Sequence, residues 1–181
     1  MDVTENLKGI ISATEIAKEI KIKIKEHIGL TASAGVSYNK FLAKLASDYN
    51  KPDGLFVIKP DQGEKFVEVL DVYRFHGIGK VTAEKMNKME IFTGMDLRQK
   101  DEVFLRKHFG KAGGYYYDIA RAIDNRPVNP DRIRKSVGSE NTFDKDLETR
   151  IELEAGLLSL IEDVWRYCER TKGYGRTVNL K

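Results

Sequence analysis

Apolar side chains recur at a regular spacing near the start of the chain and predict a long helix there. Isoleucines follow one another every four residues from Ile16 to Ile28, which keeps them on one face of a helix. A capping box precedes them, because Ser12 is followed three residues later by Glu15. A short Lys-Ile-Lys-Ile-Lys alternation would suit a strand, but the longer periodicity and the cap outweigh it. The pattern predicts a helix over residues 12–28.

The next segments combine strand and helix patterns. Residues 31–36 are small and partly β-branched, which suits a strand packed closely against its neighbours. Apolar positions then repeat at helical spacing over residues 38–48. A Lys-Pro-Asp-Gly turn leads into a second expected strand at residues 55–58. Residues 1–58 are therefore expected to form an α/β unit.

From Asp61 the strand patterns disappear and short helical patterns follow one another. Joints that contain glycine separate these helices. The expected helices cover residues 61–70, 80–89, 94–99, 101–109 and 112–124. This part of the chain is predicted to be a compact helical module.

A proline-rich basic segment, residues 126–135, is the best linker candidate. Beyond it we expect a strand at 136–143, a long amphipathic helix at 147–171 and a strand at 176–181. The buried side of that helix is expected to carry Leu153, Leu157, Leu160, Ile161, Val164, Trp165 and Cys168. The fold class predicted from the whole pattern is α+β.

Composition narrows the functional classes. The 181 residues contain 31 Lys and Arg against 28 Asp and Glu, a net charge of +3, and the charges are spread evenly. Nucleic-acid binding would therefore depend on a few placed basic groups and backbone amides rather than on a bulk positive field. No stretch approaches the ~20 apolar residues that span a bilayer, and no signal peptide is recognisable. We expect a cytoplasmic protein without a membrane partner.

The residue types that bind metals do not form a recognisable site. Cys168 is the single cysteine, and with three scattered histidines it makes no credible zinc set. Two acidic pairs, Asp101-Glu102 and Asp144-x-Asp146, stand directly before expected helices, where helix caps are common. We therefore predict no catalytic residue and no metal ligand in this chain.

The sharpest local motif is the glycine-containing tract FHGIGKVTAEKM at residues 75–86. Gly77, Ile78 and Gly79 are expected to form a tight hairpin, with a helix beginning at about Lys80. The free N–H groups and the dipole of that helix would form an anion site suited to a nucleic-acid phosphate. A plain helix–helix turn is the alternative, but the complete pattern favours phosphate binding. Gly79→Val is expected to abolish most binding, by obstructing the phosphate and straining the hairpin.

Lysines form a second candidate site near the start of the chain. Lys40 and Lys44 lie one helical turn apart, and Lys51 lies in the turn beyond that helix. Their ammonium groups could converge on a polyphosphate. From spacing alone, a solvated helix face is the better interpretation.

Two further groups of residues have side chains of the types that bind nucleic acid. Arg132, Arg134, Lys135 and Ser136 could line a phosphate backbone, although a solvated linker explains them equally well. The three tyrosines at 115–117 cannot form one stacking platform, because consecutive helix residues point about 100° apart. At least one of these tyrosines is expected in the core.

In this order, the pieces resemble the Y-family translesion DNA polymerases of the bacterial type. The resemblance rests on TASAGVSYNKFLAKLASDYNKPDGLFVI, on FHGIGKVTAEKM, on the tract from FGKAG to YYYDIARAIDNRPV, and on RIRKSVGSENTF. It covers essentially the whole chain. The lysine-rich block and the RKSVG block are specific to the family, whereas the hairpin motif occurs in many DNA-binding proteins.

The resemblance implies a division of the chain into parts. Residues 1–60 would end a partial α/β palm, 61–130 would be an all-helical thumb with a helix-hairpin-helix, and 131–135 would be a linker. Residues 136–181 would begin a β-α-β little finger. In the family the catalytic acid pair comes directly before the text that begins here at Asp2, so the chain is expected to be an internal fragment.

The resemblance also implies roles for individual residues. Lys51 resembles the lysine that contacts the triphosphate of the incoming nucleotide, and Lys44 matches a neighbouring helix position. The thumb hairpin that grips the primer strand is matched by Gly77, Ile78, Gly79 and Lys80. The backbone-contacting segment that enters the little finger is matched by Arg134, Lys135 and Ser136.

The implied function is that of a DNA-binding part of an error-prone translesion DNA-directed DNA polymerase, inactive by itself. Primer-template duplex would be its partner, while dNTP, Mg²⁺ and a sliding clamp would belong to the parent enzyme. The alternative is a stand-alone helix-hairpin-helix module without enzymatic activity, which leaves the lysine-rich block unexplained. We also expect self-association through residues 136–181, because a sheet of few strands has open edges and covers the long helix poorly.

Overall fold

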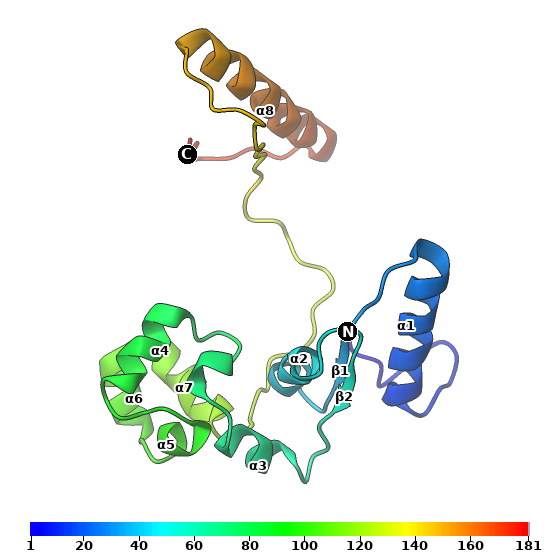
Figure 1. Cartoon of the computed structure of the whole chain (residues 1–181), viewed down its shortest axis with the longest axis vertical. Helices are drawn as coiled ribbons and strands as arrows, with labels where there is room; N and C mark the ends of the chain where they lie inside the picture. Colours follow the sequence, from blue (N-terminus) through cyan, green and yellow to red (C-terminus); the bar gives the residue numbers. More distant parts are fainter. Residues whose placement is uncertain (181) are drawn as a thin grey trace. The chain divides into compact units, whose positions relative to one another are not determined.

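The computed structural model describes residues 1–180 and divides into two compact units. The first unit ends at Val128 and the second begins at Asn129, within the proline-rich segment. The first unit holds both strands and every helix up to α7, and the second holds α8 (Figure 1).

The first helix, α1 (Ala13–Ile28), begins as its cap predicts. The Ser12 hydroxyl accepts a hydrogen bond from the Glu15 N–H at 3.4 Å. The helix ends at Gly29, whose φ of 69° is left-handed and suits glycine. None of its residues is fully buried, so its isoleucine stripe is only partly covered.

Two short strands and a helix form the α/β part of the first unit. Strands β1 (Ala34–Val36) and β2 (Leu55–Val57) pair in parallel, and α2 (Lys40–Tyr49) provides the crossover that parallel strands require. A Cβ at Gly35 would lie only 2.2 Å from the Ala43 carbonyl oxygen, so β1 approaches α2 closely because it carries a glycine there. The α/β unit predicted for this part of the chain is confirmed.

The helical module follows. It consists of α3 (Gly63–Glu68), the 3₁₀ turn η1 (Val72–Arg74), α4 (Lys80–Asn87), α5 (Gly94–Arg98), α6 (Glu102–Phe109) and α7 (Ala112–Ile119). The predicted helices are thus present, although α7 ends earlier than expected. Its end is fixed by Ala122, which turns the chain with a φ of 57°, and by the Ile123 N–H, which bonds to the Asp118 carbonyl at 3.0 Å.

A single hydrophobic core extends through the α/β part and the helical module. The rings of Phe41 in α2 and Phe75 before α4 are 5.6 Å apart and join the two parts. Tyr116 is buried and its two tyrosine neighbours are partly buried, as expected for consecutive helix residues. The largest fully buried side chains are Phe41, Phe75, Leu42, Met86, Ile91, Leu97, Leu105, Ile119, Val67 and Val72.

The second unit contains the long predicted helix but not the predicted strands. Helix α8 (Arg150–Thr171) begins with a capping box between Thr149 and Glu152. Residues 136–143 and 176–180 form no strand, and residue 181 lies outside the described residues. Residues 136–143 contain only two apolar side chains, too few for a strand face of alternating apolar residues. A strand also needs a partner strand, and the two segments do not pair with each other.

The apolar side of α8 was predicted to be buried, but it is only partly covered. Leu153, Ile161 and Trp165 are 54%, 51% and 64% exposed, so residues 129–180 cover this side of the helix only in part. Leu157, Leu160, Val164 and Cys168 are half-buried.

The two acidic pairs differ in their roles. Asp101 caps α6 by accepting from the Phe104 N–H at 2.6 Å, as predicted. Asp144 and Asp146 are not caps, because Thr149 occupies that position in α8. Across residues 1–180, no helix is both long enough and apolar enough to cross a membrane.

Candidate nucleic-acid interface

The glycine hairpin joins η1 to α4 and is anchored from both ends. Phe75 and Ile78 are buried, and the Ile78 N–H donates to the Phe75 carbonyl at 3.0 Å. Gly77 between them has a φ of 97°, which a glycine adopts without steric cost. Ile78 therefore plugs the turn, and the backbone beyond it is directed outward.

The N-terminus of α4 carries no side-chain cap among the described residues. Gly79 is the N-cap residue, with φ −81° and ψ 167°, and it lacks a capping side chain. The first N–H groups of the helix therefore have no partner within the helix or from its cap. Lys80 follows at the first helical position and is exposed. This combination offers hydrogen-bond donors and positive charge to an anion.

The two glycines of the hairpin differ in what a side chain would meet. A Cβ at Gly79 would have no atom within 4 Å, and the φ there is ordinary, so the expectation that Gly79→Val strains the hairpin is wrong. Strain would arise at Gly77, where φ is positive and a Cβ would lie 3.1 Å from Tyr115 Cε1. The fold itself thus places no demand for glycine at residue 79.

Two of the predicted lysines meet on one carboxylate. Lys51 Nζ lies 2.6 Å from Asp48 Oδ1, and Lys44 pairs with Oδ2 of the same side chain. The hydrogen bond from Lys44, and to a smaller extent the one from Lys51, lowers the pKa of Asp48. Lys40 is directed elsewhere, because its Nζ donates to the Pro127 carbonyl at 3.1 Å.

The sequence patterns did not lead us to predict Asp48 as part of this site, although its spacing from the two lysines indicates the pairing. It lies four residues after Lys44 and three before Lys51, and side chains at these separations are neighbours on a helix. An anion that binds both ammonium groups has to compete with this carboxylate. All three side chains are exposed, so the competition takes place in water.

The basic residues at the end of the predicted linker lie in the second unit. Arg134, Lys135 and Ser136 are exposed and belong to an irregular segment. The Arg134 guanidinium stacks on Tyr167 of α8 at 4.7 Å from the ring centre. The cation is thus held on α8 while the two residues after it remain open to solvent.

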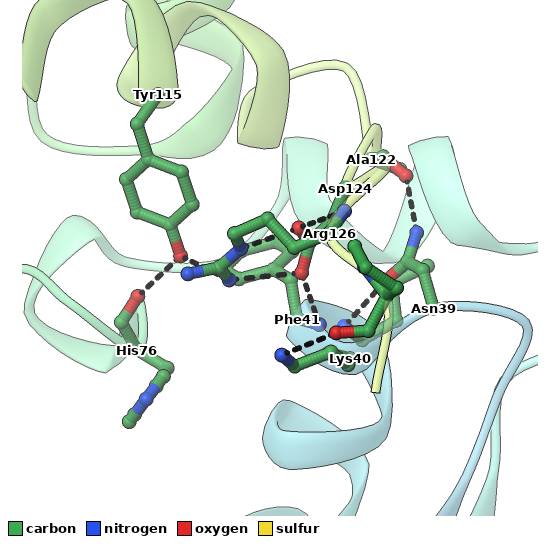
Figure 2. Close-up of polar contacts among 10 residues, drawn as sticks. Asn39, Lys40, Phe41, His76, Tyr115, Ala122, Asp124 and Arg126 are labelled. Atoms are coloured by element: carbon green, nitrogen blue, oxygen red, sulfur yellow. Dashed lines mark hydrogen bonds and ion pairs between the residues drawn. The ribbon is translucent and has the colours of Figure 1, made fainter. Parts of the chain in front are cut away.

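A buried carboxylate connects the chain after α7 to the first turn of α2 (Figure 2). The side chain of Asp124 is 1% exposed and accepts from Arg126 Nε at 2.6 Å and Nη2 at 2.9 Å. It also accepts from the Phe41 backbone N–H at 3.0 Å. The bonds from Arg126 are the main cause of the lowered pKa of Asp124, and burial opposes them.

The same arginine reaches the hairpin through a tyrosine. The Arg126 guanidinium lies 4.7 Å from the ring centre of Tyr115 and donates to the Tyr115 hydroxyl at 3.3 Å. That hydroxyl donates in turn to the His76 carbonyl at 3.2 Å. This cluster was not predicted from the sequence, because Asp124 ends an expected helix (residues 112–124) and Arg126 begins the expected linker segment (residues 126–135), and no local pattern connects the two.

The described residues do not fit a metal. Across residues 1–180, no three His, Cys, Asp or Glu side chains are grouped so that they could hold an ion. The site therefore offers phosphate-binding donors and cations, and its carboxylates serve as partners for them.

Comparison with known proteins gives matches at both ends of the chain and along its whole length. The model of the impB/mucB/samB family matches residues 1–48, and the model of that family's C-terminal domain matches residues 134–181. DNA polymerase IV 2 of Agrobacterium fabrum is 57% identical over 181 residues, which is 100% of this chain and 51% of that protein. DNA polymerase IV of Akkermansia muciniphila is 49% identical over the same length and is covered to 50%.

Solved structures agree with these relatives. A Y-family DNA polymerase chimera matches with a TM-score of 0.77 and 32% identity, over 92% of this chain and 48% of its own. An insertion ternary complex of Dbh DNA polymerase matches with a TM-score of 0.65 and 36% identity, over 71% of this chain and 38% of its own. The chain spans about half the length of the curated relatives it matches.

Proposed function

This chain belongs to the impB/mucB/samB family, the Y-family translesion DNA polymerases, and corresponds to a region of DNA polymerase IV; on that premise we propose that it binds primer-template duplex through the hairpin at residues 75–80. The role of this surface is to hold the duplex by its backbone. Phosphate contacts position a protein on DNA without reading sequence. The binding is therefore expected to be independent of sequence.

The observation that carries the proposal is the open N-terminus of α4. A Cβ at Gly79 would touch nothing in the protein, and no side chain among residues 1–180 caps the helix there. The fold has no need of a glycine at this position, whereas a phosphate oxygen that approaches the N–H groups does need the space. The glycine is explained by the ligand.

Lys44 and Lys51 are the proposed contacts for the triphosphate of an incoming nucleotide. Their ammonium groups already converge on a carboxylate, Asp48. A triphosphate presents several charged oxygens of the same kind and would replace Asp48 as their partner. Arg134, Lys135 and Ser136 of the second unit are proposed as further contacts to the DNA backbone.

The finer assignments follow from the family. We propose residues 1–60 as the end of the palm, 61–130 as the thumb, 131–135 as the linker and 136–181 as the start of the little finger. We propose binding to a sliding clamp and a cytoplasmic location for the whole polymerase. A stand-alone helix-hairpin-helix module remains the alternative function, and the Lys44–Asp48–Lys51 group argues against it.

The Mg²⁺ of the family would supply charge stabilisation for phosphoryl transfer, but the described residues do not fit it. We propose that its ligands belong to the half of the relatives that this chain does not span. The 181-residue polypeptide is then expected to show no primer extension with Mg²⁺ and dNTPs. Extension above background by a highly purified sample would contradict this.

Duplex binding by Gly79→Val tests the proposal. The affinity for a labelled duplex, measured by fluorescence anisotropy, should fall at least tenfold, while the protein should remain folded with only a small fall in melting temperature, because valine is a poorer N-cap residue than glycine. Gly175→Val is the matched control, because a Cβ at Gly175 would meet no close atom either, with only an ordinary contact at 3.6 Å to Thr177 O. Equal binding by wild type and Gly79→Val would place the DNA site elsewhere.

A further inference from the structure

Tyr115 holds the hairpin by two contacts, the first of which is drawn in Figure 2. Its hydroxyl donates to the His76 carbonyl at 3.2 Å. Its ring lies against Gly77, where a Cβ would be 3.1 Å from Tyr115 Cε1. The positive φ of Gly77 and the tyrosine ring therefore fit together at the turn that precedes the N-terminus of α4.

Arg126 fixes the tyrosine. The guanidinium stacks on the Tyr115 ring at 4.7 Å from its centre, and its Nη2 donates to the hydroxyl at 3.3 Å. The planar guanidinium can stack and bond to a carboxylate at the same time, which a lysine cannot do. Arg126 does so through its Nε and Nη2 bonds to Asp124.

The segment that carries Asp124 and Arg126 is itself fastened to the first turn of α2. Asp124 accepts from the Phe41 N–H at 3.0 Å, and Asn39 Nδ2 donates to the Ala122 carbonyl at 2.8 Å. A continuous series of contacts thus runs from α2 to the hairpin. It connects α2, the helix that carries Lys44, with the backbone that we propose as the DNA contact.

We infer that Arg126 and Tyr115 are positioning residues for the hairpin: they fix the direction of the N–H groups at the start of α4 relative to α2. Neither residue needs to touch DNA for this role. The consequence for binding rests on the proposed function, whereas the mechanical link from Arg126 to the hairpin does not. The two parts can be measured separately.

The mechanical link is tested by amide hydrogen exchange in the full chain without DNA. The Ile78 N–H is bonded to the Phe75 carbonyl across the turn, so its exchange rate reports opening of the hairpin. Because a typical hydrogen bond limits opening by a modest factor, we expect exchange at Ile78 to be about fivefold faster in Arg126→Gln and in Tyr115→Phe. Exchange at Leu97, whose N–H bonds to the Thr93 carbonyl in α5, should not change.

Arg121→Gln is the matched control. Arg121 stacks on Tyr117 at 3.5 Å from the ring centre and donates to the Arg98 carbonyl at 3.0 Å, so its loss removes an arginine–tyrosine pair of the same kind. The contacts of Arg121 do not include the hairpin. Exchange at Ile78 in this variant should equal that of the wild type.

Duplex affinity is the second readout. Arg126→Gln and Tyr115→Phe should weaken binding about fivefold, while Arg121→Gln should bind like the wild type. Unchanged exchange at Ile78 in both variants would overturn the mechanical link, whether or not the chain binds DNA. Faster exchange with unchanged affinity would overturn the role in DNA binding. A wild-type chain that binds no duplex would refute the proposed function and that role together, and the exchange data would still decide the link.

Discussion

Asp48 controls the charge of the proposed triphosphate site. Its carboxylate pairs with both Lys44 and Lys51, and the resulting hydrogen bonds lower its pKa. Since all three side chains are exposed, the pairs are screened and contribute little to stability. Their effect is on the availability of the two ammonium groups to a ligand.

Asp48→Asn should therefore strengthen anion binding. Removing the competing carboxylate should raise the affinity for tripolyphosphate about threefold, a modest gain typical of exposed charge pairs. Isothermal titration calorimetry measures this directly. Asp53→Asn, which removes an exposed partner of Lys21, is the control and should leave the affinity unchanged. A fall in affinity on Asp48→Asn would show that Asp48 supports the site rather than competes for it.

Asp124 should make folding sensitive to acid. Its pKa is below the ordinary 3.8 in the folded protein, so the stabilisation is present above the unfolded-state pKa and is lost as the pH falls through the folded-state value. Asp124→Asn should lower the free energy of unfolding at pH 7 by about 2 kcal/mol, since it weakens a charge-assisted bond and keeps the bond to Phe41. Urea denaturation across the pH range checks this. If the wild type and Asp124→Asn still differed by the same free energy of unfolding well below pH 3.8, the stabilising role of the ionised Asp124 would be contradicted.

A helix or strand could be predicted from the sequence where a local signal marks its end. Ser12, Asp101 and the glycine hairpin carry local signals, and the structure follows them at α1, α6 and α4. The end of α7 and the bond from Asp124 to Phe41 depend on partners far away in the sequence, and no local pattern reveals them. The strands expected in the second unit failed for the same reason, because strand pairing is decided by the partner.

The turn that follows α4 contains a strained residue that a substitution could relieve. Glu90 is exposed and has a φ of 60°, a left-handed conformation that costs a side chain about 1 kcal/mol. Glu90→Gly should raise the free energy of unfolding by about 0.5 kcal/mol after the added flexibility of the unfolded chain is subtracted. Thermal unfolding measures the gain. Glu84→Gly, within α4 itself, should instead lower stability by about 1 kcal/mol, and equal effects of the two changes would refute this explanation.

At the scale of the whole molecule, the first unit is held by a core and the second is not. The core residues all belong to the first unit, while α8 has no buried residue. Its exposed side carries Leu153, Ile161 and Trp165 at helical spacing. An apolar stripe of this kind drives association when another surface can cover it.

Self-association through residues 136–181 is therefore expected at tens of micromolar protein. Ile161→Lys should weaken it, because the charge would have to be buried with the stripe. Val103→Lys in α6 changes an exposed valine of the first unit and should have no effect. Sedimentation velocity distinguishes the outcomes, and a strictly monomeric wild-type chain would contradict the expectation.

The central claim, that the N-terminus of α4 binds DNA phosphate, is tested most directly by titrating the ¹⁵N-labelled chain with a short unlabelled duplex. The account predicts that the amide signals of Gly79, Lys80 and Val81 shift most, that the shifts reverse as salt is added, and that they are absent in Gly79→Val. Unmoved signals at these three residues, while other amides shift on saturation with the duplex, would contradict it.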